Sequence, residues 1–312
     1  MSHIQSVLSP SGIQAARINH VWWVMLIVCT VVWVLVAGAT LLAVARGRKA
    51  ASTATDGQLT FVVGIAGAVT VVVLIGLLFD TIVVGRSLET IRTADALRIQ
   101  VTGYQWWWDV QYENPVAGLR VTTANELHIP VGRPVAIDLL SSDVIHSFWV
   151  PNLQGKIDLV PGRKNELWLQ ADKPGIYRGQ CAEYCGAQHA HMALLVTAES
   201  EEQFQRWLTA NRASAPPPQT PEQVRGRDVL ERGPCAMCHA VQGTSAGAHM
   251  GPDLTHVASR STLGAGTVPN TRGYLAGWIM DPQHIKPGNH MPPTGLGDEE
   301  LQAVLAYLET LK

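Results

Sequence analysis

The chain has 312 residues, of which 47% are hydrophobic and 15% are charged, and its formal net charge at pH 7 is −2. This length allows two or three domains, and the apolar content excludes an intrinsically disordered protein. Because the charge is nearly balanced and no region carries a basic stripe, we expect no nucleic-acid partner.

Two apolar runs near the start of the chain predict membrane-spanning helices. Residues 21–45 contain no charged side chain, and at about 1.5 Å per residue they exceed the roughly 30 Å hydrocarbon core of a bilayer. A second run covers residues 60–85. A pair of buried core helices is the alternative, but the flanking sequence lacks the amphipathic pattern that would enclose them. We expect residues 1–97 to form an N-terminal membrane segment.

The loop between the two runs predicts the orientation of the spans. It holds Arg46, Arg48 and Lys49 against Asp56. The positive-inside rule places such a loop in the cytoplasm, so both ends of the segment face outward. The first twenty residues lack the apolar core of a signal peptide.

The remaining sequence predicts two domains of different kinds. Residues 98–210 contain short alternating segments separated by turn residues, which predict a small β-sandwich or barrel. Residues 211–222 are rich in proline and alanine and predict a semi-rigid linker. Helical patterns at 221–233, 271–282 and 297–312 predict that residues 223–312 form an all-α domain.

A group of soft metal donors follows the β-rich region. Cys181, Cys185, His189 and Met192 lie within twelve residues, and His146 lies 35 residues before the first cysteine. Thiolate, imidazole and thioether donors select copper over calcium or magnesium. A mononuclear blue-copper site uses one cysteine, so two cysteines allow the thiolates to bridge a second metal. A disulfide between the cysteines is the alternative, but it does not require histidine and methionine at these spacings.

The C-terminal region contains a haem attachment motif. Cys235, Cys238 and His239 form the Cys-x-x-Cys-His pattern, in which two thiols bind haem covalently and the imidazole is the proximal ligand. A zinc or thioredoxin-like site is the alternative, which the adjoining histidine and the lack of a second nearby pair disfavour. Covalent haem attachment takes place outside the plasma membrane, in agreement with the loop charges.

The predicted second axial ligand of the haem is Met291. It lies 52 residues after His239 in a proline-rich loop, and a Met/His pair is the usual axial set of a c-type electron carrier. His290 is the rival ligand. The other methionines are expected elsewhere: Met237 inside the motif, Met250 too close along the chain, and Met280 in the helical core.

The cysteine loop resembles the dinuclear CuA centre of cytochrome c oxidase subunit II, and residues 143–163 resemble the signature that precedes this loop in the family. The resemblance implies that Cys181 and Cys185 bridge two copper ions and that His146 and His189 each cap one. It also implies two weak ligands, one on each copper: Met192 and the backbone carbonyl of Glu183.

Further residues near the two motifs also have expected roles. The side chains of Glu183 and Asp158 fall in the family's magnesium region at the interface with subunit I. His191 lies two residues from His189 and would point to the opposite face of an extended segment, in a supporting or surface role. Residues 251–254 resemble the cytochrome c loop whose proline carbonyl, here that of Pro252, orients the proximal histidine.

The aromatic run 105–109 resembles the segment through which the family receives electrons from cytochrome c, with Trp106 as the accepting residue. A packed core face is the alternative for such a run. Trp107 and Tyr112 approximate the tyrosines that the family often has. Residues 56–60 lack the Glu that marks the mouth of a proton path into subunit I in many relatives, so we do not expect that contact with subunit I here.

Taken together, the chain resembles subunit II of a bacterial caa3-type cytochrome c oxidase. The implied fold is two transmembrane helices, a cupredoxin-like CuA domain and a class I cytochrome c domain. Electrons would pass from a soluble or membrane-bound cytochrome c through haem c and CuA to haem a of subunit I. There, at haem a3 and CuB, oxygen reduction would be coupled to proton pumping.

The resemblance also implies subunit III as a partner and the bacterial plasma membrane as the location, with both folded domains on the periplasmic side. Two other classes of protein remain. One is the CuA module of a reductase acting on nitrogen oxides, and the other is a copper-handling membrane protein without enzymatic activity.

Overall fold

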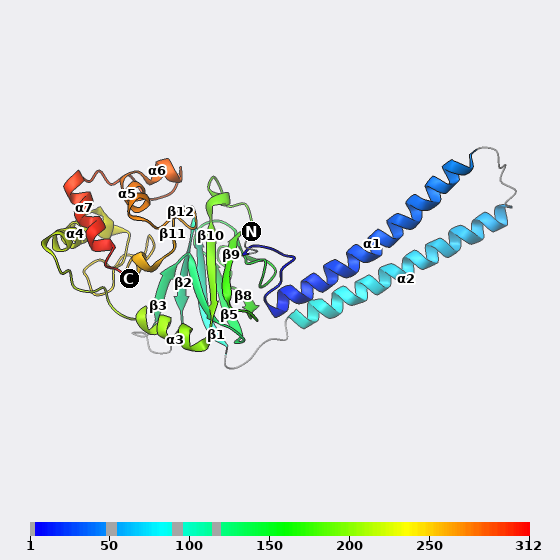
Figure 1. Ribbon diagram of the computed structural model, residues 1–312, viewed down its shortest axis with the longest axis horizontal. Coiled ribbons are helices and arrows are strands. Elements are labelled where there is room, and N and C mark those ends of the chain that lie inside the picture. The colour runs from blue at the N-terminus through cyan, green and yellow to red at the C-terminus, as the bar shows by residue number, and fades with distance from the viewer. Residues whose placement is uncertain (1–3, 48–54, 89–95, 114–119) are drawn as a thin grey trace. The chain divides into compact units, whose positions relative to one another are not determined.

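The computed structural model describes residues 4–47, 55–88, 96–113 and 120–312. The chain divides into two compact units, one of Ala16–Ile91 and one of Met1–Ala15 with Arg92–Lys312. The second unit contains a β domain, built from strands β1 to β10 and helix α3, and a C-terminal domain, built from helices α4 to α7 (Figure 1).

Two long helices, α1 (Ile13–Arg46) and α2 (Asp56–Leu88), make up most of the first unit (Figure 1). Each has an apolar stretch long enough to cross a bilayer, and none of that stretch is buried within the protein. Helices that are apolar on every side suit a lipid environment. His20 pairs with Asp80 at 3.6 Å, so the acidic group within the second span has a partner on the first helix.

The β domain is a sandwich of two five-stranded sheets, ordered β3-β2-β1-β5-β8 and β4-β10-β9-β6-β7. Strand β1 pairs with β5 and strand β4 pairs with β10 in parallel, and the other neighbours are antiparallel. The first five strands are β1 (Leu97–Tyr104), β2 (Trp107–Tyr112), β3 (Val121–Ala124), β4 (Glu126–Pro130) and β5 (Val135–Ser141). The others are β6 (His146–Trp149), β7 (Ile157–Leu159), β8 (Asn165–Leu169), β9 (Gly175–Cys181) and β10 (Ala193–Glu199).

The core of the β domain lies between the two sheets. Trp108 from one sheet packs edge-on against Phe148 from the other, with ring centroids 6.0 Å apart. Alternate residues of β1 are buried, as expected for a strand with one face in the core. Helix α3 (Glu201–Ala210) follows β10 and begins with a capping box between Ser200 and Gln203. Its Phe204 contacts Tyr112 and extends the core.

The C-terminal domain is helical, as predicted. Its helices are α4 (Pro221–Arg232), α5 (Arg272–Met280), α6 (Pro282–Ile285) and α7 (Asp298–Leu308). Short 3-10 turns cover Pro234–Met237 and Val257–Ser259, and β11 (Thr262–Leu263) pairs with β12 (Val268–Pro269). Helices α4 and α7 cross closely at Gly226, where a Cβ atom would lie 1.9 Å from the carbonyl oxygen of Ala303.

The prediction that Met280 belongs to the core is wrong. Met280 ends α5 and is 37% exposed, whereas the buried residues of this helix are Leu275 and Ile279. Successive helical residues point about 100° apart, so the residue after Ile279 leaves the buried face.

Candidate copper and haem sites

Sheet pairing brings the separated parts of the cysteine motif together. Strand β6 begins with His146 and strand β9 ends with Cys181, and the two strands pair antiparallel with Phe148 opposite Cys181. The chain then loops over 182–192 and returns as β10, which pairs with β9. A rigid sheet therefore fixes both ends of the cysteine loop.

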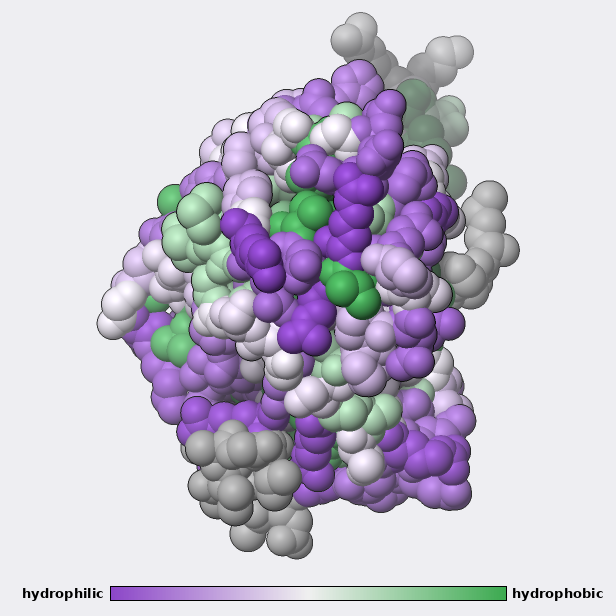
Figure 2. Space-filling view, turned by 90° about the vertical axis from the view of Figure 1, so that its left-hand side faces the viewer, coloured by the Kyte–Doolittle hydropathy of each residue, from purple (hydrophilic) through white to green (hydrophobic). Residues whose placement is uncertain are grey.

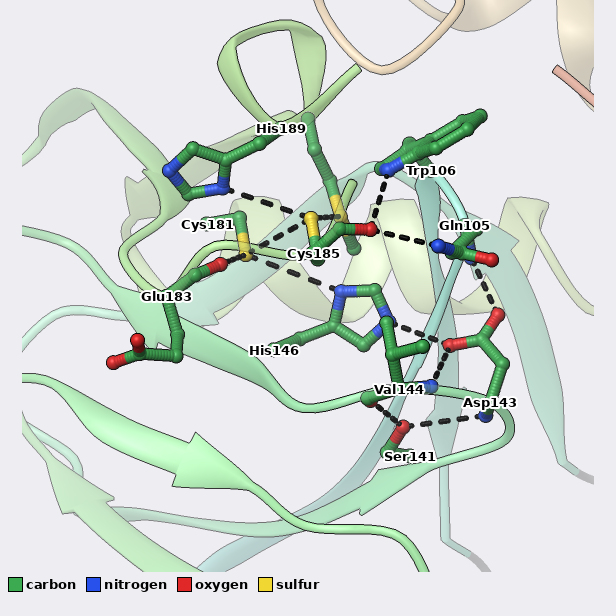
Figure 3. A network of polar contacts seen from close by, with 11 residues as sticks. Gln105, Trp106, Ser141, Asp143, Val144, His146, Cys181, Glu183, Cys185 and His189 are labelled. Atoms are coloured by element: carbon green, nitrogen blue, oxygen red, sulfur yellow. Dashed lines mark hydrogen bonds and ion pairs between the residues drawn. The ribbon is translucent and has the colours of Figure 1, made fainter. Parts of the chain in front are cut away.

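The predicted donors lie around the two thiols (Figure 3). The Sγ atoms of Cys181 and Cys185 are 3.7 Å apart, and the carbonyl oxygen of Glu183 lies 3.1 Å from Cys181 Sγ. The remaining donors each contact one thiol: His146 Nδ1 lies 3.9 Å from Cys181 Sγ, and His189 Nδ1 and Met192 Sδ lie 3.6 Å and 3.9 Å from Cys185 Sγ. A disulfide would require about 2.05 Å between the sulfurs, so both thiols are free here.

The site is almost completely withdrawn from solvent. His146, Cys181, Cys185 and Met192 are all buried. The hydrogen bond between the two thiols lowers the pKa of Cys181 and, together with burial, raises the pKa of Cys185. Soft, buried and converging donors of this kind suit copper.

Asp143 orients the His146 ring, a role that the sequence analysis did not predict. Its carboxylate accepts hydrogen bonds from His146 Nε2 at 2.7 Å and from the backbone N–H groups of Val144 and Gln105, both at 2.6 Å. Because Nε2 donates to Asp143, Nδ1 keeps its lone pair toward Cys181. Burial disfavours the imidazolium, but the bonds to Cys181 and Asp143 outweigh it and raise the pKa of His146.

Trp106 and Gln105 hold the cysteine loop from the side. Trp106 Nε1 donates to the carbonyl oxygen of Cys185 at 2.9 Å, and Gln105 Nε2 donates to the same oxygen at 2.8 Å. Trp106 is buried, and it connects the loop to the segment between β1 and β2. Gly103 makes room for the histidine, since a Cβ atom there would lie 2.9 Å from the His146 ring.

The placement of His191 opposite His189 was expected only for an extended segment. Residues His189–His191 form a 3-10 turn rather than an extended segment, so the two histidines are not on opposite faces of a strand. The exposed His191 interacts through Nδ1 with Gln188 at 2.7 Å.

The two carboxylates of the expected magnesium region hold a lysine. Lys156 Nζ lies 3.1 Å from Asp158 Oδ1 and 2.9 Å from Glu183 Oε2. All three side chains are more than two-fifths exposed, so the cluster lies at the protein surface. The Glu183 backbone faces the thiols while its side chain faces Lys156.

The haem motif lies at the start of the C-terminal domain. Cys235 is in a short 3-10 turn, and Cys238 and His239 follow it directly. His239 Nδ1 bonds to the carbonyl oxygen of Pro252 at 2.7 Å, which leaves Nε2 as the nitrogen available to a metal. Gly251 is required beside it, because a Cβ atom there would lie 2.7 Å from the imidazole.

Met291 lies in a loop shaped by Gln283. Gln283 Nε2 donates to the carbonyl oxygens of Asn289 and Met291, both at 2.8 Å. The rival ligand His290 lies near Trp106, with ring centroids 6.3 Å apart. Figure 2 shows the side of the molecule that lies on the left in Figure 1, which is mostly hydrophilic with a few hydrophobic residues near its centre.

Two of the methionines that we did not expect to be haem ligands are surface residues. Met237 is 68% exposed and Met250 is 75% exposed.

The thiols of Cys235 and Cys238 are free and half-buried and lie beside the oriented His239 imidazole, which suits covalent haem attachment.

The fold and the two donor sets define a membrane-anchored redox protein with a copper-type β-sandwich and a c-type cytochrome domain. Residues 115–199 match the family described as cytochrome c oxidase subunit II, periplasmic domain, and residues 223–312 match cytochrome c. The chain therefore contains a region that matches the periplasmic domain of cytochrome c oxidase subunit II, followed by a region that matches cytochrome c.

Named relatives agree with this assignment. The chain is 42% identical over 215 residues to cytochrome c oxidase subunit 2 of Alkalihalophilus pseudofirmus, which covers 69% of this chain and 61% of that protein. It is 32% identical over 232 residues to the Bacillus subtilis protein of the same name, over 71% of this chain and 64% of that one. The chain thus spans somewhat less than two thirds of these relatives' length.

A solved structure is also similar in sequence. The periplasmic domain of subunit II of cytochrome oxidase from Bradyrhizobium japonicum is 32% identical. The similarity covers 39% of this chain and 97% of that one, with a TM-score of 0.36. The family implies copper in the β domain and haem c in the C-terminal domain.

Proposed function

We propose that the chain is the electron-accepting subunit of a bacterial caa3-type cytochrome c oxidase. The observation that carries this proposal is the convergence of three donor side chains and one carbonyl on two buried thiols, in a chain that also carries a haem motif. When bound, the copper pair and haem c each supply a one-electron redox centre. Electrons would come from a donor cytochrome c and leave toward haem a of subunit I.

In this proposal the β domain holds a dinuclear copper centre. Cys181 and Cys185 would supply the thiolate ligands of the metals, and His146 and His189 would supply the imidazole ligands. Met192 and the Glu183 carbonyl complete the set. The sheet, with Asp143 and the Trp106 contact, keeps these donors in place. A site held rigidly by its surroundings changes little in geometry between redox states, which favours fast electron transfer.

The C-terminal domain would hold haem c covalently. Cys235 and Cys238 would bind the haem covalently, and His239 and Met291 would be its two iron ligands. The Pro252 carbonyl accepts from His239 Nδ1, so Nε2 would be the nitrogen that binds. The domain boundaries that we propose are 98–210 for the copper domain, 211–222 for the linker and 223–312 for the cytochrome.

A magnesium ion at Glu183 and Asp158 is a further part of the proposal. These carboxylates supply hard oxygen donors, but they now hold the Lys156 ammonium. Magnesium binding therefore requires Lys156 to move away, and subunit I would have to cause this movement where it covers the exposed cluster.

The proposed partners are subunit I, with haem a and the haem a3/CuB centre, subunit III, and a donor cytochrome c. The proposed location is the bacterial plasma membrane, with both folded domains on the periplasmic side. Oxygen reduction and proton pumping would take place in subunit I.

A reduced-minus-oxidised visible spectrum of the complex, purified in mild detergent through a tag on this chain, tests the proposal. An a-type band beside the c-type band, together with oxygen consumption, is the expected result. A c-type band alone, in a preparation that retains its large membrane partner, would contradict the proposal and assign the chain to another acceptor.

A further inference from the structure

Lys286 is a buried cation at the contact between the β domain and the C-terminal domain, and neither proposed metal site uses it. It directly follows α6 and is only 2% exposed. Its Nζ donates to the carbonyl oxygens of Trp106 at 2.8 Å and His191 at 2.7 Å, both in the β domain. A third bond goes to Gly264 of its own domain at 2.7 Å. Lysine is rarely buried this fully unless it is paired.

Three acceptors match the three N–H donors of an ammonium group. Burial disfavours the charged form of the side chain and lowers the pKa of Lys286 to about 7. All three acceptors belong to the backbone, so the cation fixes main-chain atoms of both domains rather than flexible side chains. If the domains moved apart, two of these bonds would be lost, so the contact is specific in geometry.

Other contacts extend the interface on both sides of Lys286. Gln188 Nε2 donates to the carbonyl oxygen of Pro287 at 2.7 Å. Further along the β domain, the backbone N–H of Ala193 donates to the carbonyl of Ala265 at 2.9 Å. At the far edge, the Ser261 backbone and hydroxyl both donate to Glu126 at 2.8 Å. Two segments of the C-terminal domain, 261–266 and 286–290, therefore lie against the β domain.

The position of Lys286 connects the two candidate sites. On one side it binds Trp106, which itself donates to the Cys185 carbonyl of the cysteine loop. On the other side it precedes Met291 by five residues, in a loop where Asn289 Nδ2 donates to the Lys286 carbonyl. One side chain thus joins the cysteine loop to the loop that carries the proposed haem ligand.

We propose that Lys286 is the positioning residue that fixes the C-terminal domain against the Trp106 face of the β domain and so sets the rate of electron transfer between them. This inference rests on the proposed function, because it needs a redox centre in each domain. Without Lys286 two bonds across the contact are lost, while the bonds of Gln188, Ala193 and Glu126 remain, so the distance and orientation of the two centres are fixed less strictly. Transfer then depends on the fraction of time in which the docked arrangement forms.

The test uses the full chain in detergent, loaded with copper and haem c. Lys286→Met removes the three donors with little change in length. Lys164→Met is the matched control, because Lys164 is exposed and bonds to Asp138 within the β domain. After rapid photoreduction of haem c, the rate of its reoxidation by the copper centre is measured. In Lys286→Met we expect this rate to fall about tenfold or more, since hydrogen bonds to a charged group each contribute roughly this factor.

Amide hydrogen exchange of the metal-free chain provides a second measurement that does not depend on electron transfer. Exchange over residues 105–106 and 188–193 should increase in Lys286→Met and stay unchanged in Lys164→Met. The copper spectrum and the haem potential should match those of the unmodified chain. A slower rate with unchanged exchange, or a rate equal to that of the control, would overturn the inference.

If Lys286→Met does not fold, Glu126→Gln is measured in its place. It weakens the same interface at its exposed edge, away from both candidate sites, so it should slow transfer in the same direction but less. No effect of Glu126→Gln on either rate or exchange would then contradict the inference. If the unmodified chain fails to bind copper or haem c, the proposed function fails instead, and the two failures are distinguishable.

Discussion

Replacing Asp143 by Asn is the sharpest test of how the copper site is held. The Asp143 carboxylate receives three N–H donors, from His146 Nε2, Val144 N and Gln105 N. It accepts all three because both of its oxygens are acceptors. An asparagine amide has the same shape but only one acceptor oxygen, so its NH₂ group must face at least one of these donors.

Either orientation of the amide carries a cost. If the oxygen stays toward His146, the NH₂ group meets the N–H of Gln105, and an unsatisfied buried donor costs about 1–3 kcal/mol. If the NH₂ group faces His146, the ring must accept at Nε2 and carry its proton on Nδ1, the nitrogen that faces Cys181. That proton would have to be displaced by copper. A loss of about 10- to 100-fold in copper affinity follows, which equals about 1.4–2.8 kcal/mol.

Copper affinity of the detergent-purified chain can be measured by competition with a chelator, following the visible absorption of the thiolate–copper centre. Ser141→Ala is the matched control, because Ser141 bonds within the same turn, to Asp143 N at 3.3 Å and to the Val144 carbonyl, without touching the imidazole. The control should retain copper like the unmodified chain. Equal affinity and an identical spectrum for Asp143→Asn would refute the orienting role.

Three further changes have defined outcomes. Gly226→Ala should destabilise the C-terminal domain by about 1–3 kcal/mol, because its Cβ would overlap the Ala303 carbonyl; unchanged thermal melting by circular dichroism of the haem-loaded chain would contradict this. Burial raises the pKa of Asp109 in the folded chain. Above that raised pKa the buried carboxylate is ionised and lowers the free energy of unfolding. Below the pKa of the same group in the unfolded chain, the carboxyl is protonated in both states and the loss disappears. Asp109→Asn should therefore gain more in melting temperature at mildly alkaline pH than at about pH 4, and a pH-independent difference would argue against it. Glu183→Gln should lower Mn²⁺ occupancy of the proposed magnesium region, seen by electron paramagnetic resonance of the complex, and leave copper binding intact, because copper would use only the backbone carbonyl; loss of copper would show that the side chain matters there.

The elements and donor groups that sequence could predict are local ones. The helical pattern of α4, the apolar helices and the alternating strands each follow from neighbouring residues. The donors of the cysteine loop are also close together in sequence, and only His146 is distant in sequence from the others. His146 lies beside the cysteines because β6 and β9 are neighbours in one sheet.

The residues that sequence did not predict act through contacts that form only in the folded chain. Lys286 bonds to Trp106 across 180 positions of the chain, and nothing in the residues around either one indicates the other. Asp143 lies three residues before His146, a spacing that has meaning only once the turn between β5 and β6 is formed. The direction of His191 depended on whether its segment is extended, and the structure shows a 3-10 turn instead.

Trp106 lies between the cysteine loop and the contact between the domains, so copper binding and docking would be coupled through it. Its indole N–H is bonded to the cysteine loop, and its own carbonyl is bonded to Lys286 of the C-terminal domain. A metal that orders the loop should therefore strengthen the domain contact. Because coupling free energies are reciprocal, the factor by which copper favours docking must equal the factor by which docking favours copper retention. A chain that holds its two domains together would thus lose copper more slowly, and the fused cytochrome would stabilise the centre that it reduces.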